Sequence, residues 1–186
     1  MRKDFGAKTW VYPMPVFIIA TYGADGTPDA MNAAWGGIIG GNKISFCISE
    51  NHKTTENFLA RKAFTVSMAD AAHEVECDYV GVVSAHKVPD KLDKAGFHTT
   101  PSKLVDAPII DELPMTLECR LVSYDTETEQ LVGEIVNVSA EETILDENGQ
   151  IDLTKFEPIT FDPVHGSYLK LGAVAGKAFS DGKKIK

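Results

Sequence analysis

The chain has 186 residues, of which 44% are apolar and 24% are charged, and its formal net charge is −9. This length is sufficient for a sizeable core, and we expect one domain spanning residues 1–186. The acidic balance argues against nucleic acid and anionic membrane surfaces as main partners, because phosphate-rich surfaces require basic patches on the protein.

The cysteines and the N-terminal stretch indicate a cytoplasmic protein. Cys47, Cys77 and Cys119 are odd in number and far apart, so they fit neither a disulfide framework nor a CxxC pair. Free thiols of this kind fit a reducing compartment. The apolar run after Pro15 is only as long as a strand and ends at a turn, so we expect neither a signal peptide nor a membrane span.

The first predicted elements are a hairpin and a further strand. The stretch "VFIIATY" at 16–22 is β-branched and apolar, and "GADGTPD" behind it is typical of a hairpin turn. The return segment contains "AMNAAWGG" at 30–37. In "KISFCIS" at 43–49, apolar residues alternate with small ones, which predicts a half-buried strand.

Helices and strands then alternate irregularly. We expect a helix at 53–61, a strand in "AFTVSM" at 63–68, and short helices at 73–83 and 90–96. The proline-punctuated segment 101–114 is predicted to be an irregular connection.

The second half contains the longest strands. Two long alternating runs, "MTLECRLVSYDTETE" at 115–129 and "QLVGEIVNVSAEE" at 130–142, predict an antiparallel pair. The acidic, loop-like segment 138–156 is expected to be solvated surface, and the tail from residue 161 mixes small residues with Tyr168 and Phe179. Near-sequential hairpins with few helices between them predict a mainly β fold, an antiparallel sheet closing into a small barrel.

Several common catalytic and metal-binding motifs are absent from the sequence. It has no GxGxxG, and "GGIIGGNK" lacks the spacing and the Lys-Ser/Thr ending of a P-loop. It also lacks a GxSxG elbow. The histidines have no metal-ligand spacing, so we predict no metal ion. They are His52, His73, His86, His98 and His165.

The segment "MNAAWGG" at 31–37 is suited to a flat heterocycle. Small residues leave the backbone open to close approach, and Asn32 offers an amide that can bond the edge of a ring. Main-chain groups of Ala33, Ala34 and Trp35 can do the same, with the indole as an apolar wall. The alternative is that Trp35 is a core residue and the glycines only turn the chain.

The segment "SENHKTTENF" at 49–58 is suited to an anion. If it opens a helix after a strand, the free N–H groups and partial positive charge of the helix start attract a phosphate, and Lys53 adds a full charge. The alternative is that Ser49 or Asn51 caps the helix and the rest is solvated surface. Together the two segments suit a ligand with a ring at one end and a phosphate at the other.

The order of these segments resembles the flavin reductase-like family of FMN-binding split barrels, and most closely its flavoredoxin branch. The resemblance covers nearly the whole chain. It rests on "VYPMPVFIIATYGADGTPDAMNAAWGG", "KTTENFLARKAFTVSM", "DYVGVVSAHKVPDKLDKAGF", "APIIDELPMTLECRL" and "GKAFSDGK".

The resemblance implies an antiparallel split β-barrel with a few short flanking helices, assembled as a homodimer that binds FMN near the subunit interface. It assigns no catalytic residue. The implied contacts of the isoalloxazine ring are Asn32, Ala33, Ala34 and Trp35. The implied contacts of the ribityl chain and phosphate are Ser49, His52, Lys53, Thr54, Thr55 and Asn57.

Three further cofactor contacts follow from the same resemblance. Ser84 and Lys91 fall in a segment that lies near the cofactor in relatives, although Ala85 stands where a glycine is expected. Tyr168 falls in a C-terminal stretch that can approach the flavin, from its own subunit or from the partner. Its alternative role is that of a packing tyrosine.

Three functions remain open at this point. The first is an FMN-dependent oxidoreductase that takes reducing equivalents from NAD(P)H as a substrate and passes them to free flavin or another acceptor. The second is a flavoredoxin-type electron carrier with slow NAD(P)H turnover and a redox partner protein. The third is a binding protein without redox turnover that holds another phosphorylated ligand or a haem.

Overall fold

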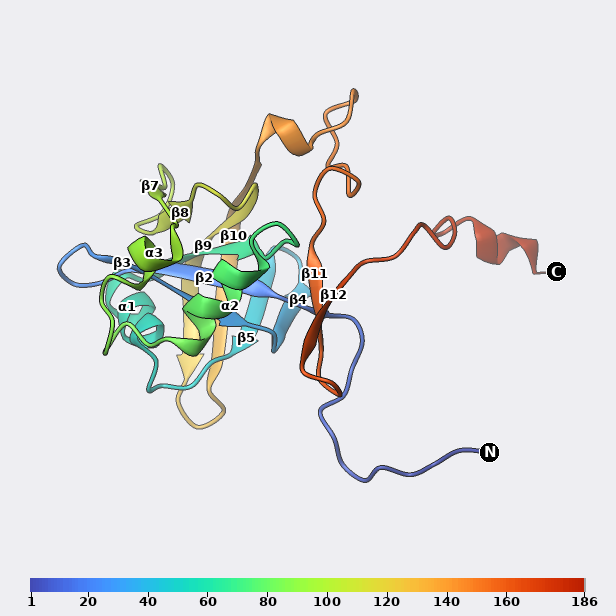
Figure 1. Cartoon of the computed structure of the whole chain (residues 1–186), viewed down its shortest axis with the longest axis horizontal. Helices are drawn as coiled ribbons and strands as arrows, with labels where there is room; N and C mark the ends of the chain where they lie inside the picture. The colour runs from blue at the N-terminus through green and yellow to red at the C-terminus, as the bar shows by residue number, and fades with distance from the viewer. Residues whose placement is uncertain (186) are drawn as a thin grey trace.

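A curled antiparallel sheet of seven strands forms the body of the protein (Figure 1). The structure is a computed structural model and describes residues 1–185. All strand pairs in this sheet are antiparallel, in the order β3-β2-β6-β9-β10-β5-β4. The strands are β2 (Phe17–Tyr22), β3 (Pro28–Ala33), β4 (Gly36–Gly40), β5 (Lys43–Cys47), β6 (Ala63–Met68), β9 (Met115–Asp125) and β10 (Gln130–Ala140).

The connection between β3 and β4 explains why the sheet curls. These two strands are the opposite edges of the sheet, yet only Ala34 and Trp35 separate them in the sequence. An extended chain spans at most ~3.6 Å per residue, so Ala33 and Gly36 are within about 11 Å of each other. The two edges of the sheet therefore approach each other at this connection.

Two smaller sheets accompany the main one. One consists of β1 (Met14–Pro15), β11 (Ile159–Asp162) and β12 (Ser167–Lys170), and the other of β7 (Thr99–Pro101) and β8 (Pro108–Ile110). The expectation of an irregular connection over 101–114 was therefore wrong at Pro101 and Pro108–Ile110, and β11 and β12 lie where no element was predicted. Strands this short are too brief to show an alternation of apolar and polar residues. They form because they pair with other strands in the folded chain, and a local sequence pattern does not reveal them.

The helices agree closely with the predictions. They are α1 (Lys53–Arg61), α2 (Glu74–Val82) and α3 (Lys91–Ala95), with short 3-10 turns at Glu142–Ile144 and Asp181–Lys184. The residue at the N-cap of α1 is His52, without a side-chain capping bond, so the alternative that Ser49 or Asn51 caps this helix is wrong.

Strand β2 has a core on each of its faces. Ile19 packs in a cluster with the aromatic residues Phe58 and Phe64, whereas the neighbouring Ile18 packs in a second cluster with Val80 of α2. All five of these side chains are fully buried. Each contributes about 1.5–3 kcal/mol by burial, so β2 and the helix α2 are held firmly together.

The chain ends lie outside this core. Residues 1–13 are exposed and run away from the sheet on the same side as the C-terminal segment 171–185, which is also nearly all exposed (Figure 1). Tyr12 attaches the N-terminal segment by donating a hydrogen bond from its hydroxyl to the carboxylate of Asp162. Within residues 1–185, no helix has the length and apolar character needed to cross a bilayer.

Candidate functional site

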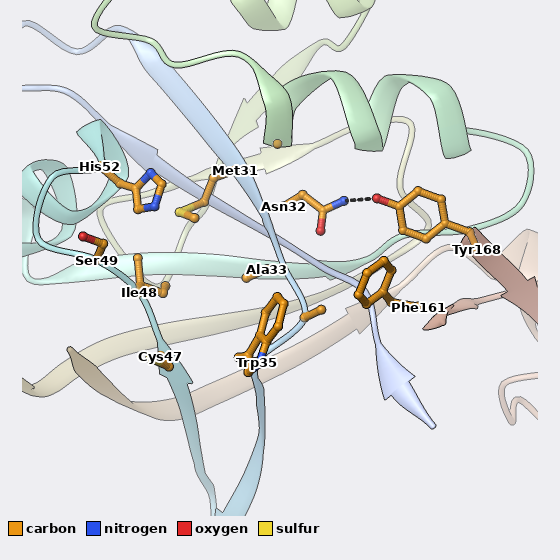
Figure 2. Close-up of a pocket in the computed structure, with 12 residues that line it drawn as sticks. Met31, Asn32, Ala33, Trp35, Cys47, Ile48, Ser49, His52, Phe161 and Tyr168 are labelled. Carbon is orange, nitrogen blue, oxygen red and sulfur yellow. Dashed lines mark hydrogen bonds between the residues drawn. The ribbon is translucent and has the colours of Figure 1, made fainter. Parts of the chain in front are cut away.

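A cavity of about 280 Å³ opens beside the connection between β3 and β4 (Figure 2). Strand β3 and the connection form its floor, the end of β5 forms one side, and β11 and β12 form the other. Its lining residues are Met31, Asn32, Ala33, Ala34, Trp35, Cys47, Ile48, Ser49, His52, Gly81, Phe161 and Tyr168.

Aromatic rings line one side of this cavity. The indole of Trp35 is 51% exposed and its ring centroid lies 6.3 Å from that of Phe161, which in turn lies 6.0 Å from that of Tyr168. The alternative that Trp35 is a core residue is therefore wrong. The backbone here is fixed, because the N–H of Cys47 donates to the carbonyl of Trp35 at 2.9 Å. The small side chains of Ala33 and Ala34 leave room for a flat ligand beside the rings.

Asn32 has its donor groups turned away from the cavity. Its Nδ2 donates to the carbonyl oxygen of Cys77 at 3.1 Å and to the hydroxyl of Tyr168 at 3.4 Å. The Tyr168 hydroxyl donates in turn to Oδ1 of Asp78 at 2.7 Å. Burial, together with this bond to Asp78, raises the pKa of Tyr168 well above its usual range. Tyr168 therefore reaches the cavity from its own chain as a neutral phenol.

A second cavity, of about 180 Å³, continues the first toward α1. The two share Met31, His52 and Gly81. A Cβ atom at Gly81 would lie 2.7 Å from the Cβ of Asn32, so glycine at this position lets α2 pack closely on β3. The second cavity also contains residues from the start of α1 and from the loop after α2, including Lys53 and Ser84.

Lys53 brings the charge that the sequence predicted. Its Nζ lies 2.6 Å from Oε1 of Glu56, and this bond lowers the pKa of the Glu56 carboxyl. The side chain of Lys53 is partly exposed, and its partner is more than half exposed. Such an exposed pair is weak, so the ammonium can change partners at little cost when an anion arrives.

Four other predicted contact residues are buried, and internal partners occupy their polar groups. Thr55 Oγ1 donates to the Ser49 carbonyl at 2.8 Å, and Asn57 Nδ2 donates to Thr21 Oγ1 at 3.1 Å. Thr54 and Lys91 both bind the carboxylate of the buried Asp29. Thr54 and Lys91 line the second cavity with their polar groups already bonded, whereas Thr55 and Asn57 line neither cavity.

Ser84 and its neighbour lie in an unstrained loop. The Ser84 hydroxyl accepts a long bond of 3.3 Å from the N–H of His86. Over residues 1–185 the non-glycine residues with positive φ are Lys62, Glu129 and Phe179, so Ala85 does not need the conformation that favours glycine. The departure from the expected glycine therefore does not distort this part of the site.

The sequence reasoning missed several residues of the site. Phe161 lies on β11, which carried no recognisable strand pattern, and Gly81 and Asp78 lie on a helix that seemed unrelated to the ligand. Cys47 was interpreted as a free thiol on a strand and not as part of the site. The one usable signal in the sequence was at Cys47, which occupies an outward-facing position in a strand whose inward-facing residues are apolar.

The part of the chain that the structure describes has no group of three or more His, Cys, Asp or Glu side chains suited to a metal ion. The cavities are instead lined by aromatic rings, small side chains, amides, hydroxyls, an imidazole and a lysine. This set of groups suits an organic anion with a flat apolar ring.

Comparison with known proteins relates these cavities to a family. A family model described as "Flavin reductase like domain" matches residues 9–160. The flavoredoxin of Desulfovibrio vulgaris (Miyazaki F) is 36% identical, with a TM-score of 0.93 over 98% of this chain and 100% of that chain. A flavoredoxin from Methanosarcina acetivorans is 27% identical, with a TM-score of 0.89 over the whole of both chains.

A more distant structure bears on the fold alone. It is an FMN-binding domain of a flavin reductases-like enzyme from Shewanella baltica OS155, 16% identical, with a TM-score of 0.79 over 88% of this chain and 89% of that chain. Its likeness confirms the predicted fold class, a mainly β split barrel with an antiparallel sheet and few short helices.

Proposed function

The chain belongs to the flavin reductase-like family, and on that premise we propose that it is an FMN-binding flavoprotein oxidoreductase. It would pass reducing equivalents from NAD(P)H to flavin or another acceptor. The observation that carries the proposal is the pair of joined cavities, with an aromatic, small-residue slot at one end and Lys53 at the other.

The residues present fit FMN. The isoalloxazine ring needs a flat apolar slot, which Ala33, Ala34 and the exposed face of Trp35 supply. The phosphate needs a cation and hydrogen-bond donors, which the start of α1 and Lys53 supply in the second cavity. His52 lines both cavities and therefore stands where the ribityl chain would pass from one to the other.

The predicted contact residues divide into two groups by what their side chains already bind. We propose direct contact with FMN for Asn32, Ala33, Ala34, Trp35, Ser49, His52, Lys53, Ser84 and Tyr168. For Thr54, Thr55, Asn57 and Lys91, whose polar groups have internal partners, we propose that they hold the backbone around the phosphate in place.

FMN, when bound, supplies the redox chemistry, and the protein supplies binding, orientation and access. The cavity beside Trp35 is open to solvent on one side, which would admit a nicotinamide ring or a redox partner. The neutral phenol of Tyr168 and the amide of Asn32 add polar groups without adding charge to the ring site.

A second candidate function is that of a flavoredoxin-type electron carrier with slow NAD(P)H turnover. The likeness to the Desulfovibrio flavoredoxin, at 36% identity over 98% of this chain, favours it. Both functions use the same FMN site and differ in the electron donor. They are separated by the rate at which a nicotinamide reduces the bound flavin.

An absorption spectrum of gently purified protein, followed by anaerobic addition of NADH and then NADPH, tests both functions. Flavin bands that bleach quickly with one nucleotide are the expected result for the oxidoreductase. Bands that bleach with dithionite but with neither nucleotide identify the carrier. A protein that is colourless and does not bind added FMN, but binds another phosphorylated ligand or a haem, would overturn both.

We also propose that the protein is a homodimer. Strand β4 is a sheet edge with Ile38 63% exposed and Ile39 55% exposed, next to the cavity through Trp35. An exposed apolar edge strand is normally covered by a partner.

Light scattering should give twice the monomer mass for the natural chain and one monomer mass for Ile38→Lys. The matched change Val122→Lys, on an exposed part of β9, should leave the dimer intact.

We further propose a cytoplasmic location. All three cysteines are free, and Cys47 is exposed beside the proposed flavin site. An exposed thiol of this kind remains reduced most readily in the cytoplasm. Fractionation of the source cells, with the protein followed by an antibody, tests this.

A further inference from the structure

Two residues that line the first cavity, Asn32 and Tyr168, form a chain of hydrogen bonds with Asp78, and all the bonds of this chain run in one direction. Asn32 Nδ2 donates to the Tyr168 hydroxyl, and the hydroxyl donates to Asp78 Oδ1 at 2.7 Å. The second N–H of Asn32 donates to the carbonyl oxygen of Cys77 at 3.1 Å. The three residues come from β3, β12 and α2, so this chain of bonds joins three separate elements at the cavity.

The chemistry of the acceptors fixes that direction. A backbone carbonyl cannot donate, so the amide nitrogen of Asn32, and not its oxygen, must face Cys77. The Tyr168 hydroxyl has one hydrogen, and once this hydrogen is directed to Asp78 the oxygen can only accept from Asn32. Figure 2 shows the amide nitrogen of Asn32 turned toward Tyr168 and the amide oxygen turned toward the space between Ala33 and Phe161.

We propose that Asp78 is a positioning residue that acts through Tyr168 on Asn32. It holds the Asn32 amide so that only the Oδ1 acceptor faces the cavity. This arrangement selects a heterocycle with an N–H on its edge. This inference rests on the proposed function and deepens it. The oxidised isoalloxazine ring has a single N–H, at N3, between two carbonyl groups. The Asn32 oxygen would accept from N3–H, while both of its own donors are already occupied.

Asp78 is needed because the Tyr168 hydroxyl could otherwise donate its hydrogen to a different acceptor. Without a carboxylate acceptor, the phenol can rotate and donate to the Asn32 oxygen or into the cavity, which removes the acceptor that N3–H requires. The half-buried position of Tyr168 makes an unsatisfied hydroxyl costly, so the phenol would take that alternative.

Binding of FMN and of FMN methylated at N3 to the purified apoprotein tests the inference. Methylation removes the N–H, and the natural chain should bind the methylated compound at least about tenfold more weakly than FMN. In Asp78→Ala the released phenol competes for the Asn32 oxygen, and this ratio should fall several-fold. It should also fall in Tyr168→Phe, because one N–H of Asn32 loses its acceptor and the amide can turn. Asp78→Asn keeps an acceptor oxygen and should therefore preserve the ratio. A purely structural role of Asp78 would not link the ratio to the presence of this acceptor oxygen.

The control and the opposing outcomes separate this inference from the proposed function. Asp93→Ala, which removes an exposed carboxylate from α3, should leave the ratio unchanged. Tight FMN binding with equal affinity for the methylated compound would overturn the inference and leave the function standing. A full ratio in both Asp78→Ala and Tyr168→Phe would do the same, because steric exclusion of the methyl group would then explain it. Failure to bind either compound would overturn both proposals.

Circular dichroism confirms that each variant is folded before its affinity is compared. Because Tyr168→Phe removes one oxygen atom and keeps the ring beside Phe161, it serves as the test if Asp78→Ala does not fold.

Discussion

The Asp29 carboxylate lies 3.0 Å from the Lys91 ammonium, and both side chains are buried. Lys91 also donates to the carbonyl oxygens of Val80 and Val83, and Thr54 donates to the other oxygen of Asp29 at 2.7 Å. One ion pair thus connects β3, the start of α1, the end of α2 and α3. All of these elements surround the second cavity.

Replacing Lys91 with Met should destabilise the protein by about 3–5 kcal/mol, because it leaves the buried carboxylate of Asp29 without its charged partner. The midpoint of urea unfolding measures the effect. The matched change Lys94→Met breaks an ion pair with Asp90 in which both side chains are more than half exposed, and should cost at most about 1 kcal/mol. Equal costs for the two changes would contradict a stabilising role for the buried pair.

Replacing Lys53 with Ala should weaken FMN binding about tenfold while leaving riboflavin binding nearly unchanged, because only FMN has the phosphate that the lysine would meet. Titration of both flavins, followed by flavin fluorescence, measures this difference. Lys43→Ala, at the far end of β5, should alter neither affinity. If the loss is the same for riboflavin as for FMN, the phosphate is not at Lys53.

Replacing both Lys53 and Thr54 with Ala should weaken FMN binding more than the single change, and for two separate reasons. Thr54 holds Asp29, so its loss should lower stability as well as FMN affinity. We expect at least a tenfold loss of affinity, with charge removed at position 53 and backbone order lost at position 54. Unchanged FMN affinity in a folded double variant would rule out a phosphate site at the start of α1.

Replacing Trp35 with Ala should weaken FMN binding severalfold and reduce quenching of the flavin fluorescence, since the indole is the wall of the slot. Because the indole is half exposed, the free energy of unfolding should change by less than about 1 kcal/mol. Denaturation and flavin titration of the same sample measure both quantities. Unchanged FMN affinity in a folded variant would show that the indole does not contact the flavin.

Two buried thiols should make stability fall at high pH. Burial raises the pKa of both Cys77 and Cys119 from 9.0 to about 12. Between these values the unfolded chain loses a proton that the folded protein keeps, so the stability they contribute is complete below pH 9 and declines as the pH rises toward 12. Urea unfolding from pH 8 to 10.5 should show a smaller decline in Cys119→Val than in the natural chain. An identical decline would contradict the assignment.

The sequence predicted the fold well where a local pattern was long enough. The alternation in 115–142 and the helix at 53–61 correspond to β9, β10 and α1. Strand β4 was missed because its sequence, "GGIIG", shows no alternation. A Cβ at Gly36 would lie 2.3 Å from the ring of Phe46, so a requirement of packing, invisible in the local pattern, determines its composition.

The candidate site was predictable only in part. Trp35 and Lys53 lie in the joined cavities, as the two quoted segments suggested. By contrast, the internal partners of Thr55 and Asn57 could not be read from the sequence, because Ser49 and Thr21 approach them only in the folded chain. A threonine beside a lysine at a helix start looks the same whether its hydroxyl faces a ligand or a carbonyl group.

The short connection between the two edge strands also affects local motions. Ala34 and Trp35 are the only covalent bridge between β3 and β4, so the seam of the open barrel depends on few bonds there. Strands at such an edge open far more often than central ones. A ring bound beside Trp35 would hold the two edges together. Loss of that ligand would then speed amide hydrogen exchange in β3 and β4, while exchange in the central strands β6 and β9 would remain slow.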